Sequence, residues 1–155
     1  MTGRSLAARA KELAREAGFD LAGVARADRP PDLAFFAEWV ARGHAGEMSY
    51  LSSQVAKRSD LRAAFPWARS VLCVGLQYDT LHPYSTEAPA DRGWISRYAW
   101  GDDYHDVMKA MLERLAARLR DEAGPFEARA YVDTGPIAEK AWAAAAGIGA
   151  WGKNG

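Results

Sequence analysis

The chain has 155 residues, and 20 Lys and Arg balance 20 Asp and Glu, so its formal net charge is zero. This length can bury one substantial core, and 6 Trp, 6 Tyr and 5 Phe exclude an intrinsically disordered chain. A single cysteine, Cys73, excludes an internal disulfide framework and a cysteine-built metal or iron–sulfur site within these residues. The balanced charge gives no general electrostatic attraction to nucleic acid.

The N-terminal segment is charged and helically periodic, without the apolar centre of a secretory signal. No apolar run reaches the roughly 18 residues that span a bilayer. We therefore expect a cytoplasmic protein that does not associate with membranes. Its histidines, His44, His82 and His105, are too scattered for a zinc site, so no metal site is expected.

The first half of the chain alternates between helical and extended patterns. A helix is predicted over Ser5–Ala17, ending at Gly18, and a strand over Phe19–Ala27. After a Pro-Pro break, a second helix is predicted over Asp32–Arg42. A short helix over Ser49–Ala56 follows a glycine-containing loop.

The second half begins with the clearest strand, Ser70–Tyr78, which is apolar almost throughout. A long loop over residues 79–93 leads to the longest predicted helix, Asp103–Glu122. A third strand is predicted over Glu127–Asp133, followed by an Ala-rich helix over Pro136–Ala146.

This order of elements predicts an α+β fold, in which helices flank a mixed β-sheet. We expect one domain over residues 1–155. The Gly-rich end, residues 147–155, resembles a loop on its way to another element, which predicts that the domain is truncated.

A candidate acid lies in Asp133-Thr134-Gly135-Pro136. A carboxylate at the end of a strand, before a turn into a helix, occupies the position where open α/β sheets bind ligands. Asp133 could act as a general acid, and Thr134 could cap the following helix. The alternative is that Asp133 itself only helps to cap that helix.

A second candidate site is the stretch Arg97–His105, which combines aromatic residues, an arginine and a histidine. Tyr104 and His105 fall in the first turn of the long helix, where free backbone N–H groups favour an anionic ligand. Tyr98 and its aromatic neighbours could stack on a flat cofactor or base. Alternatively, the aromatic residues belong to the core and an aspartate caps the helix.

Two further features are weaker. The glycine-rich residues 147–152, with Lys153 and Asn154, could approach phosphate or amide groups, but they match neither a dinucleotide fingerprint nor a P-loop. Arg58 could reach a phosphate or carboxamide group, or it could lie on a solvated helix face.

Taken together and in order, five motifs resemble the N-terminal half of the epoxyqueuosine reductase family. These are His44-Ala45-Gly46-Glu47-Met48-x-Tyr50-Leu51, Ser70–Tyr78, Arg97-Tyr98-Ala99-Trp100-Gly101-x-Asp103-Tyr104-His105, Asp133-Thr134-Gly135-Pro136 and Ala146-Gly147-Ile148-Gly149-x-Trp151-Gly152-Lys153-Asn154. The resemblance extends over nearly the whole chain.

The resemblance implies a cobalamin-binding domain whose fold is similar to the nitroreductase-like core of reductive dehalogenases. It implies an oxidoreductase that reduces epoxyqueuosine to queuosine at the tRNA wobble position, the last step of queuosine biosynthesis. Two 4Fe-4S clusters would lie in a following ferredoxin-like domain, which this sequence lacks. The implied partners are tRNA and an electron donor, and the expected state is a monomer.

The resemblance also implies that Asp133 is the catalytic proton donor, set among Tyr98 and Trp100 in an apolar, aromatic surrounding. With the motifs above, it gives a set of candidate cofactor-binding residues: Arg58, Arg97, Tyr98, Tyr104, His105, Thr134, Ile148, Trp151, Lys153 and Asn154.

The sequence departs from the family pattern in two ways, of which the change at Lys140 is minor. Lys140 stands where the family commonly has arginine, and no cluster-ligating cysteines follow Asn154. Without clusters, we expect the fragment alone to be unable to turn over. The alternatives are a non-catalytic cobalamin carrier and a flavin-dependent, nitroreductase-like oxidoreductase.

Overall fold

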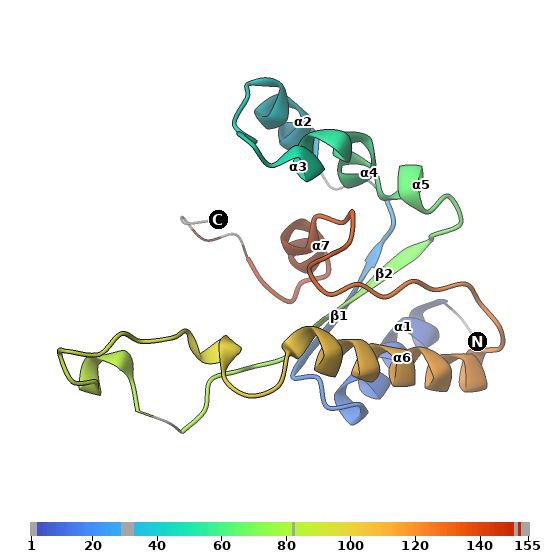
Figure 1. The fold of residues 1–155 in the computed structure, drawn as a ribbon. Helices are drawn as coiled ribbons and strands as arrows, with labels where there is room; N and C mark the ends of the chain where they lie inside the picture. The colour runs from blue at the N-terminus through green and yellow to red at the C-terminus, as the bar shows by residue number, and fades with distance from the viewer. Residues whose placement is uncertain (1–2, 29–32, 82, 151, 153–155) are drawn as a thin grey trace.

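The computed structural model describes residues 3–28, 33–81, 83–150 and 152 (Figure 1). In chain order, its elements are α1 (Gly3–Glu16), β1 (Leu21–Arg26), α2 (Leu33–Ala41), α3 (Ser49–Ser53), α4 (Val55–Ser59), α5 (Leu61–Ala64), β2 (Ser70–Gly75), α6 (Tyr104–Ala123) and α7 (Glu139–Ala145), with 3₁₀ turns at Ser85–Glu87 and Arg97–Ala99. Within these ranges, no helix is long and apolar enough to cross a membrane.

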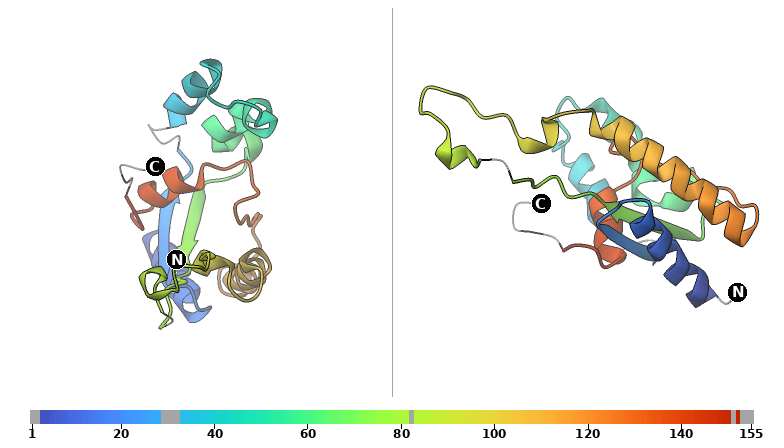
Figure 2. Two further views of the ribbon diagram at one scale, coloured as in Figure 1. Left: turned by 60° about the vertical axis from the view of Figure 1, so that its left-hand side comes forward. Right: turned by 90° about the horizontal axis from the view of Figure 1, so that it is seen from below.

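The two strands form an antiparallel ladder between the helices (Figures 1 and 2). Leu21 pairs with Gly75 and Arg26 with Ser70. Helices α1 and α6 lie on one face of this ladder and α7 on the other, while α2 to α5 gather beyond one end. The segment between β2 and α6, which we call the arm (residues 76–81 and 83–103), projects away from the body.

Side chains on the α7 face of the ladder form one core around Trp142, which is almost fully buried. Because successive strand residues point to opposite faces, Ala25 and Cys73 reach this core. Leu33 of α2 and Leu61 of α5 join the same cluster. The core therefore fixes α7 against both the strands and the neighbouring short helices.

A second core lies on the opposite face, between the ladder, α1 and α6. It is built on the fully buried Leu13 of α1 and Leu115 of α6, with Leu72 and Val74 of β2 packed against them. Ala14 of α1 and Met111 of α6 belong to the same cluster. An exposed ion pair between Arg9 and Glu122 also joins the two helices, at an N···O distance of 2.7 Å.

The predicted third strand over Glu127–Asp133 is wrong, because these residues have no regular secondary structure. Helix α6 ends at Gly124, and Pro125 supplies no backbone N–H to a ladder. The ring of Tyr131 instead packs on Phe65, with centroids 5.8 Å apart. The sheet in the described ranges is thus a two-stranded antiparallel ladder and not mixed, whereas the α+β character with flanking helices is confirmed.

Two helix boundaries also differ from prediction. Helix α7 begins at Glu139 with Ala138 as its N-cap, so neither Pro136 nor Thr134 starts or caps it. The reason is that residues 133–138 form a turn that side chains from α4 and α7 hold. The helix predicted over Ser49–Ala56 is divided at Gln54 into α3 and α4, and α5 was not predicted.

Gly23 of β1 is the point of closest approach between the ladder and the segment after α7. A Cβ at this position would lie 2.4 Å from the carbonyl oxygen of Ala146 and 2.5 Å from Cγ2 of Ile148. We expect Gly23→Ala to destabilise the fold by about 1–3 kcal/mol, because backbone must shift to admit the methyl group. Urea denaturation would measure the change in unfolding free energy.

Gly93 in the arm provides the matched control, since a Cβ there would meet no heavy atom within 4 Å. Gly93→Ala should leave the stability unchanged or slightly raised, because alanine restricts the unfolded chain. Equal denaturation midpoints for the two variants would contradict the close packing at Gly23.

Candidate functional site

The candidate acid Asp133 lies in a turn with an uncommon backbone conformation. Its φ is 58°, the only positive value at a non-glycine residue in the described part of the chain. Such left-handed conformations are unfavourable for most L-residues, although aspartate tolerates them better than most. Residues 133–138, which we call the Asp133 turn, are therefore held by contacts from their surroundings.

The Asp133 carboxylate faces the first turn of α6. The Tyr104 hydroxyl donates a hydrogen bond to Oδ2 of Asp133, and His105 Nε2 lies 3.8 Å from the same oxygen. The hydrogen bond to Asp133, together with partial desolvation, raises the pKa of Tyr104 to about 12. Two groups that can carry protons thus converge on one carboxylate oxygen.

His105 is oriented by the residue that caps α6. Asp103 Oδ1 accepts a hydrogen bond from the His105 backbone N–H at 2.9 Å and lies 2.8 Å from Nδ1 of its ring. These bonds hold the pKa of Asp103 below its ordinary value. With a proton on Nδ1, the ring donates a hydrogen bond to Asp103 Oδ1, and in this orientation Nε2 faces Asp133. The Tyr104 and His105 rings stack, with centroids 4.1 Å apart.

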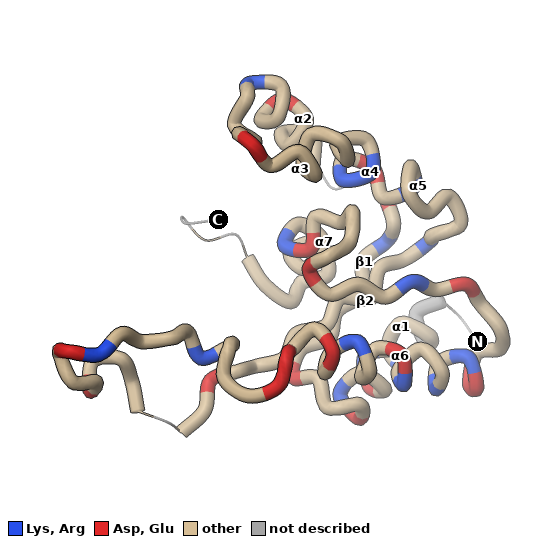
Figure 3. Tube along the Cα trace, viewed as in Figure 1, with Lys and Arg blue, Asp and Glu red and all other residues tan. Residues whose placement is uncertain are grey.

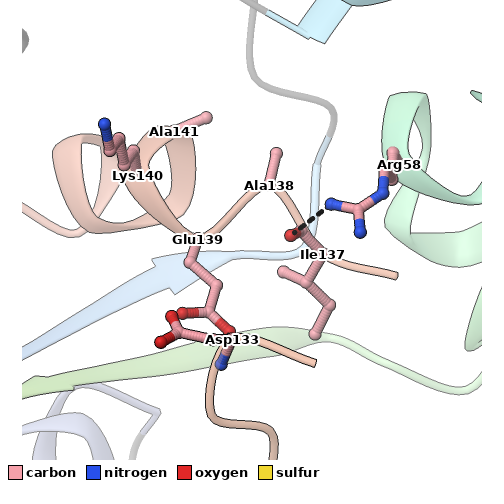
Figure 4. Close-up of a pocket in the computed structure, with 7 residues that line it drawn as sticks. All are labelled: Arg58, Asp133, Ile137, Ala138, Glu139, Lys140 and Ala141. Carbon is pink, nitrogen blue, oxygen red and sulfur yellow. Dashed lines mark hydrogen bonds between the residues drawn. The ribbon is translucent and has the colours of Figure 1, made fainter. Parts of the chain in front are cut away.

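Glu139 meets Asp133 from the opposite side, at the start of α7. Its Oε1 accepts a hydrogen bond from the Asp133 backbone N–H at 2.9 Å, and Figure 4 shows the two carboxylates side by side. The pKa of Glu139 lies above its ordinary value. The main cause is that surrounding protein desolvates the carboxylate although the residue remains exposed, and repulsion from Asp133 adds to it.

Arg58 of α4 closes the other end of the Asp133 turn. Its guanidinium donates to the carbonyl oxygens of Ile137, at 3.3 Å, and Gly135, at 3.2 Å. Its Nε atom is buried and has no hydrogen-bond partner among the described residues. Arg58 therefore binds backbone and is not simply on a solvated face. With Asp133, Glu139 and neighbouring residues, it lines an open pocket of about 270 Å³ (Figure 4).

An aromatic row continues the site towards the arm. Tyr98 meets Tyr104 edge to face, with ring centroids 5.9 Å apart, and Tyr78 meets Tyr98 in the same way at 6.2 Å. Tyr78 and Tyr98 are 59% and 50% exposed, so their rings remain accessible to a ligand. This row begins next to the Asp133 carboxylate.

Other candidate residues lie elsewhere. Arg97 is directed into the arm, where it pairs with Asp79 at 2.6 Å and donates to the carbonyl oxygens of Thr80 and Pro83, both at 2.8 Å. Ile148 packs at Gly23 of β1. The candidates Trp151, Lys153 and Asn154 lie outside the described residues.

The structure thus brings together Asp133, Thr134, Tyr98, Tyr104 and His105, with Arg58 behind the turn. The expected apolar enclosure of Asp133 is wrong, because its side chain is 56% exposed and has polar neighbours. Sequence reasoning missed Glu139. The available signal was a carboxylate six residues after Asp133, in the first turn of a helix.

Comparison with known proteins identifies the family. The family model described as "Epoxyqueuosine reductase QueG, DUF1730" matches residues 58–134, which include Arg58 and Asp133. An epoxyqueuosine reductase of Gloeobacter violaceus is 43% identical over 96% of this chain, and one of Xanthomonas campestris is 38% identical over the same share. The chain belongs to the epoxyqueuosine reductase family. It spans 46% and 42% of these two relatives, less than half of their length.

Solved structures of the family have the same fold. The Streptococcus thermophilus epoxyqueuosine reductase is 27% identical with a TM-score of 0.78, covering 99% of this chain and 41% of its own. A structure of the Bacillus subtilis enzyme, 26% identical with a TM-score of 0.70, has a catalytic loop with an aspartate swung out of the active site. It matches 97% of this chain and 40% of its own.

The hydrogen bond between Tyr104 and Asp133 can be tested by titration. Because the neutral phenol is the donor, we expect one tyrosine to ionise with a pKa of about 12, and its signal to disappear in Tyr104→Phe. The sign follows from the raised pKa: this bond stabilises the fold fully below pH 10, and its contribution is lost as the pH rises through 12. Phenolate absorbance in the near ultraviolet measures the titration.

Asp133→Asn is the complementary variant, since it removes the carboxylate charge but keeps an acceptor oxygen. The pKa of Tyr104 should move back towards 10. An unchanged tyrosine titration in both variants would show that the bond is absent in solution.

Proposed function

We propose that this chain forms the acid-bearing part of an epoxyqueuosine reductase, which reduces epoxyqueuosine to queuosine in tRNA. The observation that carries the proposal is the Asp133 carboxylate, which meets Tyr104 and His105 on an accessible surface within the family match. A related reductase, 27% identical with a TM-score of 0.71, has been solved with an epoxyqueuosine-modified tRNA stem loop. This supports tRNA as the substrate partner.

The proposed reaction converts an epoxide to an alkene, which consumes two electrons and two protons and releases the oxygen as water. Asp133 is the candidate donor of a proton to that oxygen. Tyr104 holds the carboxyl through Oδ2, and His105 Nε2 lies 3.8 Å from the same atom. The aspartate on the swung-out catalytic loop of the Bacillus subtilis relative supports a mobile acid of this kind.

The exposed surface beside Asp133 suits a cobalamin better than the adjoining pocket does. The pocket of about 270 Å³ is too small to enclose a corrin, but Tyr98 and Tyr78 present accessible rings next to the acid. We therefore propose that these rings, with Tyr104 and His105, would hold the cofactor. A bound cobalamin supplies the electrons for reduction.

The same residues do not fit iron–sulfur clusters. A cubane cluster takes four cysteine thiolates, and the chain contains only Cys73. Burial in β2 raises the pKa of this thiol to about 11, so it stays protonated and unreactive at neutral pH. We propose that the clusters and the electron donor belong to parts beyond these 155 residues.

Replacing Asp133 tests the proposal directly. In the protein that carries this chain, Asp133→Asn should lower epoxyqueuosine reduction by about 100-fold or more, since general acid catalysis contributes roughly 10²–10⁴-fold. Product analysis of a modified tRNA stem loop measures turnover. Asp28→Asn, at an exposed position just past the end of β1, is the control. Turnover at the wild-type rate in Asp133→Asn would overturn the assignment.

Cobalamin binding can be measured without turnover. We expect hydroxocobalamin to change its visible spectrum on mixing and to remain with the protein through gel filtration. Tyr98→Ala should weaken this binding by about tenfold, because a lost aromatic contact removes roughly 1 kcal/mol or more. A spectrum equal to that of free hydroxocobalamin, with no corrin retained, would rule out the site.

A further inference from the structure

The Asp133 turn is held from two separate elements. Glu139 of α7 accepts the backbone N–H of Asp133, while Arg58 of α4 donates to the carbonyl oxygens of Gly135 and Ile137. One side chain therefore binds the first residue of the turn, and the other binds its middle and end. Both side chains bind the turn through its backbone atoms.

The backbone conformation of the Asp133 turn depends on contacts from outside the turn. The left-handed conformation of Asp133 is unfavourable and persists only where the surroundings impose it. The backbone contributes a short hydrogen bond at the start of the turn, from Thr134 N–H to the carbonyl of Val132 at 2.7 Å. The side chains of Arg58 and Glu139 supply the further constraint that the rest of the turn needs.

The geometry of Arg58 suits backbone binding more than ligand binding. Its two terminal nitrogens each face a different carbonyl, as a planar guanidinium fork allows and a lysine ammonium does not. The guanidinium also lies over the Tyr50 ring, with its central carbon 5.9 Å from the ring centroid. Arg58 is thereby fixed between the α3 region and the turn.

We propose that Arg58 and Glu139 are positioning residues that together hold the Asp133 turn inward, with the Asp133 carboxylate against Tyr104 and His105. Loss of either residue releases the turn, and the carboxylate leaves these partners. The consequence for catalysis rests on the function proposed above, whereas the structural consequence can be measured without substrate.

Four variants distinguish the contribution of Arg58 to the turn from that of Glu139. Arg58→Met removes the guanidinium, and Arg58→Lys keeps the charge but not the fork. Glu139→Ala removes the acceptor, whereas Glu139→Gln keeps an amide oxygen that can accept the Asp133 N–H. Lys57→Met, at the exposed neighbour of Arg58, and Glu113→Gln, exposed on α6, are the matched controls.

Hydrogen exchange of residues 131–139 is the first readout. Arg58→Met removes two hydrogen bonds to this segment and Glu139→Ala removes one, so each should accelerate its exchange by about tenfold or more. Arg58→Lys should also accelerate it, while Glu139→Gln and both controls should exchange like the wild type. Exchange in α6 and β2 should not change.

The tyrosine titration is the second readout. When the turn leaves Tyr104, the pKa of that phenol should fall from about 12 towards 10 in Arg58→Met and Glu139→Ala, and not in Glu139→Gln. Exchange and titration equal to the wild type in a folded Arg58→Met would overturn the proposal. Acceleration spread equally over all segments would also overturn it, because it would show a general loss of stability.

Turnover provides the third readout in the protein that carries this chain. Arg58→Met and Glu139→Ala should lower kcat by about tenfold or more with little change in KM for the tRNA stem loop, since the acid is displaced but the substrate surface is kept. If the wild type reduces no epoxyqueuosine, the proposed function fails, while the exchange and titration results still decide the positioning role.

Discussion

The antiparallel ladder between β1 and β2 is the interaction on which the other contacts depend. Its two faces bury separate groups of side chains, Trp142 and its neighbours on one and Leu13 with Leu115 on the other. The core between the ladder, α1 and α6 fixes the helix that carries Tyr104 and His105. The core around Trp142 fixes α7, which carries Glu139. Asp133 lies between these two elements, so the ladder sets the width of the site.

Electrostatics within the site are local. Basic and acidic residues are intermixed along α6 and the arm (Figure 3), consistent with the zero net charge. What distinguishes the site is that Tyr104 and His105 face the Asp133 carboxylate while Glu139 binds the backbone N–H of the same residue. The three carboxylates there act differently, since Asp103 orients a ring, Glu139 holds backbone, and Asp133 is left as the accessible acid.

Much of the fold and of the site could be predicted from the sequence, because these parts depend on local sequence patterns. The long helix and the two strands follow from periodicity, an aspartate cap for that helix was one of two alternatives, and the motif order identified the family. The third strand failed because alternation in Glu127–Asp133 cannot show that Tyr131 packs on Phe65 instead of entering a ladder. The roles of Arg58 and Glu139 depend on contacts between distant segments, which no local pattern contains.

Beyond Leu76, which packs against the core between α1 and α6, the arm carries an apolar surface away from the body. Residues such as Leu81, Tyr84 and Ile95 expose large apolar side chains there, and Leu81 is exposed completely. A monomeric protein seldom leaves so many apolar side chains in water on one projecting segment. Such a surface is typical of sites that contact a ligand or another protein, and Tyr78 and Tyr98 of the same arm extend it to Tyr104 beside the Asp133 carboxylate.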